Sequence, residues 1–148
     1  MGGVAVSVKI DDREVRKMLS GILKRIGNPG PAMKILGAIA RTSIVRNFEK
    51  GGRPTKWTAL SPETLKTKKG TAILRETDGL KEAVNYKPFN DKVVVSADKV
   101  YAAIHHFGGK AGRGRKVTIP ARPYMMVQDE DWVEMKAALN EYIIRGTL

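Results

Sequence analysis

The stretch that decides the fold reads Pro31-Ala-Met-Lys-Ile-Leu-Gly-Ala-Ile-Ala-Arg-Thr-Ser-Ile-Val-Arg-Asn-Phe48. Apolar side chains recur in it every three or four positions, which is the period of one face of an α-helix. Pro31 is well placed as a first helical residue, and Gly51 and Gly52 end the pattern. The segment therefore predicts a long helix with one buried face, around which the rest of the chain is organised.

The residues before this helix predict a strand and a second helix. Residues 4–10 alternate valine or isoleucine with small or polar residues, as a half-buried strand does. Asp11 or Asp12 then caps a helix that ends near Gly27. The apolar stripe of this helix consists of Val15, Met18, Leu19, Ile22 and Ile26.

The residues after the long helix predict shorter elements and a final helix. These are a short helix from residue 61, a helical turn over 79–84, a hairpin of 86–89 with 92–97, a short helix within 99–107, a strand over 117–119 and a helix over 129–145. This order predicts an α+β fold. We expect residues 1–148 to form a single compact domain, with an antiparallel sheet, helices packed on one face, a long N-terminal helix pair and a C-terminal helix.

Composition narrows the function classes. The chain has 148 residues, a hydrophobic fraction of 42% and no cysteine, which excludes disulfides and thiolate metal sites. No apolar run reaches the roughly 18 residues of a membrane helix, and the N-terminus does not read as a secretory signal. The formal charge of +12 points to an acidic partner, which is either a nucleic acid or the acidic face of another protein.

The basic residues are spread along the chain, but residues 110–116, Lys-Ala-Gly-Arg-Gly-Arg-Lys, carry four of them with no acidic residue. The segment has too little apolar surface to offset its chain entropy, so we predict a mobile loop that orders on docking. It contains no aromatic side chain for stacking on bases, which makes a nucleic-acid role the less favoured alternative. The cations of this mobile basic loop are Lys110, Arg113, Arg115 and Lys116.

No pattern in the sequence predicts catalysis, a cofactor or a metal site. His105 and His106 are neighbours and would point about 100° apart on a helix, so they are poorly placed to bind one metal ion. Ser43 and Ser61 lack the surroundings of an activated nucleophile. The acidic run 129–131 reads as a helix start, where the helix dipole favours negative charge. We therefore expect a non-enzymatic protein.

Four short segments together form a more specific pattern. They consist of Trp57, Leu60, Ser61 and Pro62; of Leu74, Thr77, Gly79 and Leu80; of Tyr101, His105, Phe107, Gly108 and Gly109; and of Pro120, Arg122 and Pro123. In content and order they resemble segments of the phage virion morphogenesis family, which includes Mu-like morphogenesis proteins and P2-like tail-completion proteins. Asp78 is an insertion between Thr77 and Gly79 relative to that pattern.

The resemblance implies a structural component of a tailed-phage or prophage particle, acting in tail completion or head–tail joining. It implies phage tail or head-connector proteins as partners, assembly of several copies into a ring, and a location in the bacterial host cytoplasm and then in the virion. Trp57 and Leu60 are expected to pack within the chain. Arg122 lies between two prolines, so its guanidinium is either aimed at a partner carboxylate or paired within its own chain.

Overall fold

The computed structural model describes residues 12–147, so the strand predicted over residues 4–10 lies outside the described residues. The helices are α1 (Arg13–Ile26), α2 (Gly30–Lys50), α3 (Pro62–Thr67), α4 (Gly79–Glu82), α5 (Ala102–Phe107) and α6 (Asp129–Arg145), with a 3₁₀ turn η1 (Arg113–Arg115). The strands are β1 (Val84–Pro88), β2 (Val93–Ala97), β3 (Gly109–Ala111) and β4 (Val117–Ile119).

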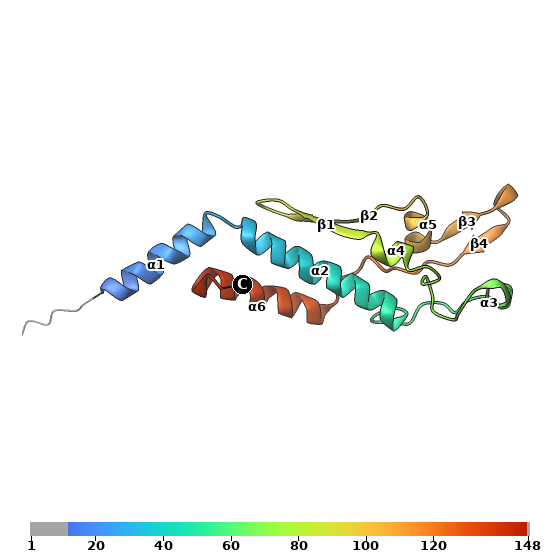
Figure 1. Ribbon diagram of the computed structural model, residues 1–148, viewed down its shortest axis with the longest axis horizontal. Coiled ribbons are helices and arrows are strands. Elements are labelled where there is room, and N and C mark those ends of the chain that lie inside the picture. The colour runs from blue at the N-terminus through green and yellow to red at the C-terminus, as the bar shows by residue number, and fades with distance from the viewer. Residues whose placement is uncertain (1–11, 148) are drawn as a thin grey trace, which may run out of the picture.

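Helix α2 lies at the centre of the molecule. The β1–β2 hairpin runs along one side of it and α6 along the other, while α3 and the β3–β4 hairpin lie at the far end from α1 (Figure 1). The predicted α+β fold, with helices on one side of an antiparallel hairpin, is confirmed. The strands form two separate two-stranded antiparallel sheets, β1–β2 and β3–β4, rather than one sheet.

The long helix forms as predicted and extends two residues beyond Phe48. It ends at Gly51, whose left-handed conformation (φ 66°) lets its N–H reach the carbonyls of Asn47 and Phe48. The buried face includes polar residues, since Ser43 and Asn47 are as inaccessible as Ile44 and Phe48. These polar groups need partners inside the protein, and α6 and the chain leading into it supply them.

Gly37, in the middle of α2, is required by the β1–β2 hairpin. A Cβ atom at this position would lie 2.2 Å from a ring carbon of Tyr86. A glycine inside a helix is normally unfavourable, but here it lets the strand approach the helix backbone closely. The hairpin is in register from Val84 opposite Ala97 to Pro88 opposite Val93, and its turn contains the predicted Asn90-Asp91 pair.

Aromatic side chains form the centre of the core. The ring centroid of Phe48 lies 5.0 Å from that of Tyr124 and 5.8 Å from that of Trp57. Such tilted and edge-on pairs contribute beyond simple burial. The buried core cluster is completed by Ile44, Leu80, Val84 and Ala102. The core therefore joins α2 to three of the four segments singled out in the sequence.

Helix α1 has 14 residues, yet none of them is buried. It extends away from the body of the molecule (Figure 1) and contacts the C-terminal end of α6. There Arg25 donates from Nε to the carbonyl of Ile143 (2.7 Å) and from Nη2 to that of Ile144 (2.8 Å). The predicted helix is thus present, but its apolar stripe is not part of the core. Between residues 12 and 147, no helix is both long and apolar enough to cross a membrane.

Candidate functional site

Four segments that are distant in the sequence line one groove of about 590 Å³. They come from residues 58–64, 74–80, 101–105 and 117–122, and together they contain most of the residues singled out above. The predicted residues that line the groove are Leu60, Ser61, Leu74, Thr77, Gly79, Leu80, Tyr101, His105, Pro120 and Arg122. The fold thus gathers the four-segment pattern into one surface feature.

The groove is mainly apolar with charges among its lining residues. Leu60 and Leu74 are half-buried in its wall, and Val117 of β4 is exposed. Lys68 and Glu76 contribute one charge of each sign. A groove that combines apolar side chains with polar and charged groups can bind a ligand or a protein segment.

Arg122 is a structural element of the groove wall. Its side chain is only 6% exposed, and it donates from Nε and Nη2 to the carbonyl of Thr58 (both 3.1 Å) and from Nη2 to that of Ala59 (3.3 Å). Burial lowers the pKa of Arg122, but arginine remains charged at neutral pH. Of the two alternatives that the sequence left open, the structure favours pairing within the chain, which ties the 58–59 segment to the 120–123 segment.

Trp57 packs within the chain, as predicted. It is 7% exposed, and its indole Nε1 donates to the carbonyl of Pro123 at 3.3 Å. Leu60 is less buried than predicted, because it lines the groove instead of entering the core. The bond between Trp57 and Pro123 therefore joins the segment that begins at residue 57 to the 120–123 segment, and both segments contribute residues to the groove.

The two histidines have different surroundings. His106 accepts a hydrogen bond at Nδ1 from the backbone N–H of Met125 (3.3 Å), and its ring meets that of Tyr124 edge-on. The Nδ1 atom of His105 is buried and has no hydrogen-bond partner among the described residues. Burial lowers the pKa of both histidines, and the charges of Arg122 and Lys68 lower the pKa of His105 further, so the surroundings disfavour the charged form of each ring.

The two histidines do not form a metal centre. In the described part of the chain, no three histidine or carboxylate groups lie together in a way that could hold a metal ion. Asp129, Glu130 and Asp131 form the first turn of α6, as the sequence predicted.

Gly108 ends α5 and lets the chain turn beneath the groove. It has a φ of 73°, and a Cβ atom there would lie 2.8 Å from the backbone nitrogen of Ala121. A larger residue would push the 119–121 segment away from α5. Next to it, Gly109 begins β3, and Phe107 is 77% exposed. These three predicted residues shape or flank the groove but do not line it.

The inserted Asp78 builds its own turn. It has a φ of 55°, which aspartate tolerates better than most residues. Its carboxylate accepts hydrogen bonds from Arg75 (2.7 Å) and Lys81 (3.0 Å), and these bonds lower the pKa of Asp78. The backbone N–H of Gly79 lies 3.4 Å from the Thr77 hydroxyl. The insertion is therefore accommodated by local ion pairs, and Leu80 still reaches the core.

The start of α3 follows the sequence prediction. Ser61 is the N-cap, with its hydroxyl accepting from the backbone N–H of Thr64 at 3.2 Å, and Pro62 occupies the first turn. This short helix forms one rim of the groove.

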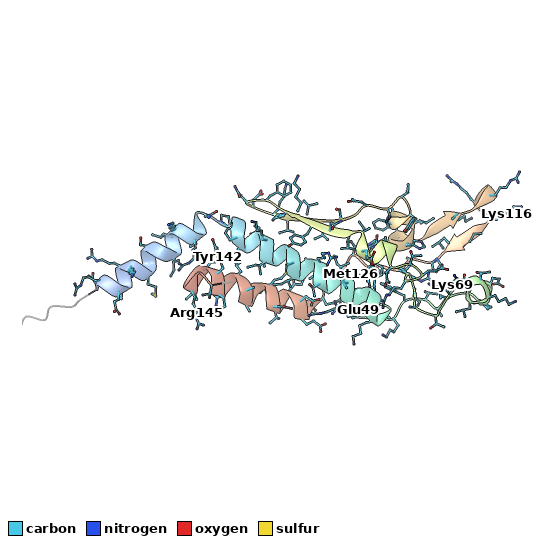
Figure 2. All side chains as sticks on the ribbon, in the orientation of Figure 1. Glu49, Lys69, Lys116, Met126, Tyr142 and Arg145 are labelled. Atoms are coloured by element: carbon cyan, nitrogen blue, oxygen red, sulfur yellow. The ribbon has the colours of Figure 1, made fainter. Side chains whose placement is uncertain are left out.

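The basic segment 110–116 is more ordered in secondary structure than the predicted loop. Lys110 lies in β3 and pairs with Thr118 of β4, while Arg113 and Arg115 form the η1 turn between the strands. Pairing supplies backbone hydrogen bonds that the charge pattern did not reveal. Lys116 lies at the outer end of this hairpin (Figure 2). Whether this tip is mobile stays a prediction.

A polar joint between α2 and α6 was missed by the sequence analysis. Asp131 is 1% exposed; it accepts a hydrogen bond from the Ser43 hydroxyl and one from Arg53 Nη2 at 3.2 Å. Arg53 Nε donates to the Asn47 side chain (2.9 Å), whose amide nitrogen in turn donates to the carbonyl of Tyr124 (2.7 Å). The local signal that could have pointed to Asp131 is the capping box that it forms with Gln128 at the start of α6.

The molecule is a small α+β protein whose sequence pattern builds one surface groove and the packing beneath it. The chain belongs to the phage virion morphogenesis family, whose sequence profile matches residues 10–143. It is 32% identical over 138 residues to the "Mu-like prophage FluMu G protein 2" of Haemophilus influenzae, covering 93% of this chain and 95% of that protein. No solved structure matches the chain at a significant level.

Proposed function

We propose that this protein is a non-enzymatic structural component of a tailed phage or prophage particle, acting in tail completion or head–tail joining. Membership of the virion morphogenesis family and the likeness to a Mu-like prophage protein support the morphogenesis role. The single observation that carries the proposal is the convergence of four separate segments on one groove. Many protein domains bind a partner segment in a surface groove.

The groove is the proposed contact for a tail or head-connector protein. Its apolar lining would take up an apolar segment of the partner, and Lys68 and Glu76 would fix its orientation. Several copies of the chain would act together as a ring in the assembled particle. Assembly would take place in the host cytoplasm, and the protein would then remain in the virion.

The test removes the gene from an inducible prophage and supplies variants in trans. We expect lysates of the deletion strain to contain unjoined or incomplete particles by electron microscopy, and the wild-type gene to restore infectious particles. A Thr118→Trp variant should fill the groove from β4 and fail to restore them. The matched control is Val94→Trp, which adds the same side chain at an exposed strand position that does not line the groove. Normal particles from the deletion strain would refute the proposal.

The basic hairpin tip supports a second candidate function, which is binding to nucleic acid. Lys110, Arg113, Arg115 and Lys116 are all exposed, and none forms an ion pair with another described residue. Contacts of this kind weaken steeply as salt rises. Absence of DNA binding by the purified protein at low salt would remove this alternative, and an unchanged affinity of an Arg113→Gln, Arg115→Gln variant would exclude the tip.

The same tip is proposed to order when the protein docks. Trypsin should cleave at Arg113 or Arg115 in the free protein and should no longer do so in the assembled particle. Cleavage that persists in the particle would show that the tip takes no part in docking.

A further inference from the structure

Helix α1 presents an apolar stripe that no described part of the chain covers. The side chains of the stripe are half-exposed or more, and Leu23 reaches 69%. A 14-residue helix is marginal in water by itself, because helices of this length gain most of their stability from packing an apolar face. The exposed apolar face consists of Val15, Met18, Leu19 and Ile26 of the predicted stripe and of the adjacent Leu23, and it needs a partner to cover it.

Helix α6 also has exposed apolar residues, on its outer face. On the side away from α2, Val133 is 68% exposed and Ile144 is also exposed, and Trp132 flanks them at 51%. A hollow of about 440 Å³ lies on this helix, lined by Lys136, Ala137, Leu139, Asn140 and Ile143. A hollow of about 400 Å³ also lies beside Gly21 of α1, where α1 meets Ile144 at the end of α6 in the same chain. Small residues at such positions let the ridges of one helix enter the hollows of another.

The charges of the two helices are opposite. Helix α1 has five basic residues and one acidic residue, a formal charge of +4, whereas α6 has five acidic and two basic residues, a formal charge of −3. On a chain of charge +12, α6 is the only helix or strand of the described residues with a net negative charge. Contact between two α1 helices would instead bring +4 against +4, which is unfavourable.

The α1 helix cannot reach along the α6 helix of its own chain. It leads away from the body (Figure 1), and Arg25 fixes its end to the last carbonyls of α6. We propose that α1 of one copy packs along the outer face of α6 of a second copy. This inference deepens the proposed assembly function and rests on it for its biological context. Because the two surfaces differ, the contact is head-to-tail, and repeating it gives a closed ring or an open filament.

The experiment uses the full chain, with mass measured by light scattering over a wide range of concentration. The mass of the wild type should rise above that of the monomer as the concentration increases, while Leu23→Asp in α1 and Val133→Lys in α6 should each remain monomeric. The matched controls, Ser20→Asp on the other side of α1 and Val94→Lys on β2, should assemble like the wild type. The two monomeric variants, when mixed, should form a 1:1 pair and nothing larger, because each keeps one intact surface.

Three results would overturn the inference. They are a wild type that stays monomeric at every concentration, a Val133→Lys variant that assembles normally, and mixed variants that do not pair although both are folded by circular dichroism. If Leu23→Asp is unfolded, Leu19→Asp replaces it on α1. If Val133→Lys is unfolded, Trp132→Asp replaces it on α6. Normal particles from the deletion strain would refute the proposed function and leave the solution contact standing. Normal particles made with Leu23→Asp would refute only the contact.

Discussion

Helices α1 and α2 adjoin in the sequence and both carry an apolar stripe, yet their surroundings differ completely. The stripe of α2 is enclosed by the β1–β2 hairpin and α6, and Ile44 and Phe48 are inaccessible to solvent. The stripe of α1 faces solvent over most of its length. A periodic apolar pattern therefore shows that a helix has an apolar face to bury. It does not show whether the same chain or another molecule buries that face.

A second difference lies in how the two helices are attached. Helix α2 is joined to α6 by apolar packing and by the polar joint around Asp131, whereas α1 is held to α6 by the two hydrogen bonds from Arg25. Buried polar groups fix one arrangement, because any other arrangement leaves them unpaired. The rigid part of the molecule and its projecting part should thus respond very differently to substitution.

The largest effect is expected at the centre of the core. Phe48→Ala should lower the free energy of unfolding by about 3–5 kcal/mol, because it removes a buried ring and leaves a cavity beside Trp57 and Tyr124. Urea unfolding of the purified protein measures this value. Phe48→Leu, which keeps most of the volume, should cost clearly less; equal losses would show that the aromatic cluster is not closely packed.

The next effect is expected at the polar joint. Asp131→Ala should cost about 3 kcal/mol, because it leaves the Ser43 hydroxyl and the Arg53 guanidinium without their buried partner. Glu134→Ala, one turn further along α6, is the control and should change stability by less than about 0.5 kcal/mol because that pair is exposed. Similar losses for the two variants would mean that the joint adds nothing specific to the packing of α2 on α6.

A pH titration should show a smaller effect of the same joint. Burial alone would raise the pKa of Asp131, but hydrogen bonds from Ser43 and the Gln128 N–H, together with the charge of Arg53, outweigh it and lower that pKa. A lowered pKa in the folded state stabilises the protein above the unfolded value of about 4, and this contribution is lost as the pH falls further.

The measurement is the difference in stability between the wild type and Asp131→Asn. That difference should be constant near neutral pH and should shrink below about pH 4. Asp78 also has a lowered pKa, but it is present in both proteins and cancels. A difference that stays constant down to the lowest pH would show that the carboxylate is not charged in the joint.

The smallest effect is expected in α1. Leu23→Ala should change the stability of the dilute, monomeric protein by no more than about 0.5 kcal/mol, since surface substitutions usually fall in this range. Ile44→Ala in α2 provides the comparison and should cost at least about 2 kcal/mol. If Leu23→Ala proves as costly as Ile44→Ala, the stripe of α1 is covered within the monomer, and the contrast between the two helices fails.

Local signals in the sequence were sufficient for most of the fold. Helix periods, the Ser61 cap, the glycine stop at Gly51 and the Asn90-Asp91 turn depend on neighbouring residues, and each predicted its element correctly. The β3–β4 hairpin was predicted only in its second strand. Its first strand is short and contains Lys110, so nothing in its composition distinguishes it from a loop.

Long-range partners were beyond the reach of the sequence. Ser43 and Asp131 are 88 positions apart, and the capping box of Gln128 and Asp131 indicates where α6 begins but not that Ser43 is the partner. The groove residues were singled out only because they recur in a known family pattern; no periodicity indicates that residues 58–64 and 117–122 meet. The exposure of the α1 stripe could not be predicted either. A helix that packs against its own chain and a helix whose apolar face stays exposed have the same amphipathic pattern.

A groove lined by four separated stretches of the sequence exists only in a chain that has finished folding. A short peptide with the sequence of one stretch supplies only one part of the groove lining. An incomplete or cleaved chain lacks part of that lining as well. Under the proposed function, a partner that binds this groove would therefore bind only complete, folded copies, and defective copies would be left out of the particle without a separate quality-control step.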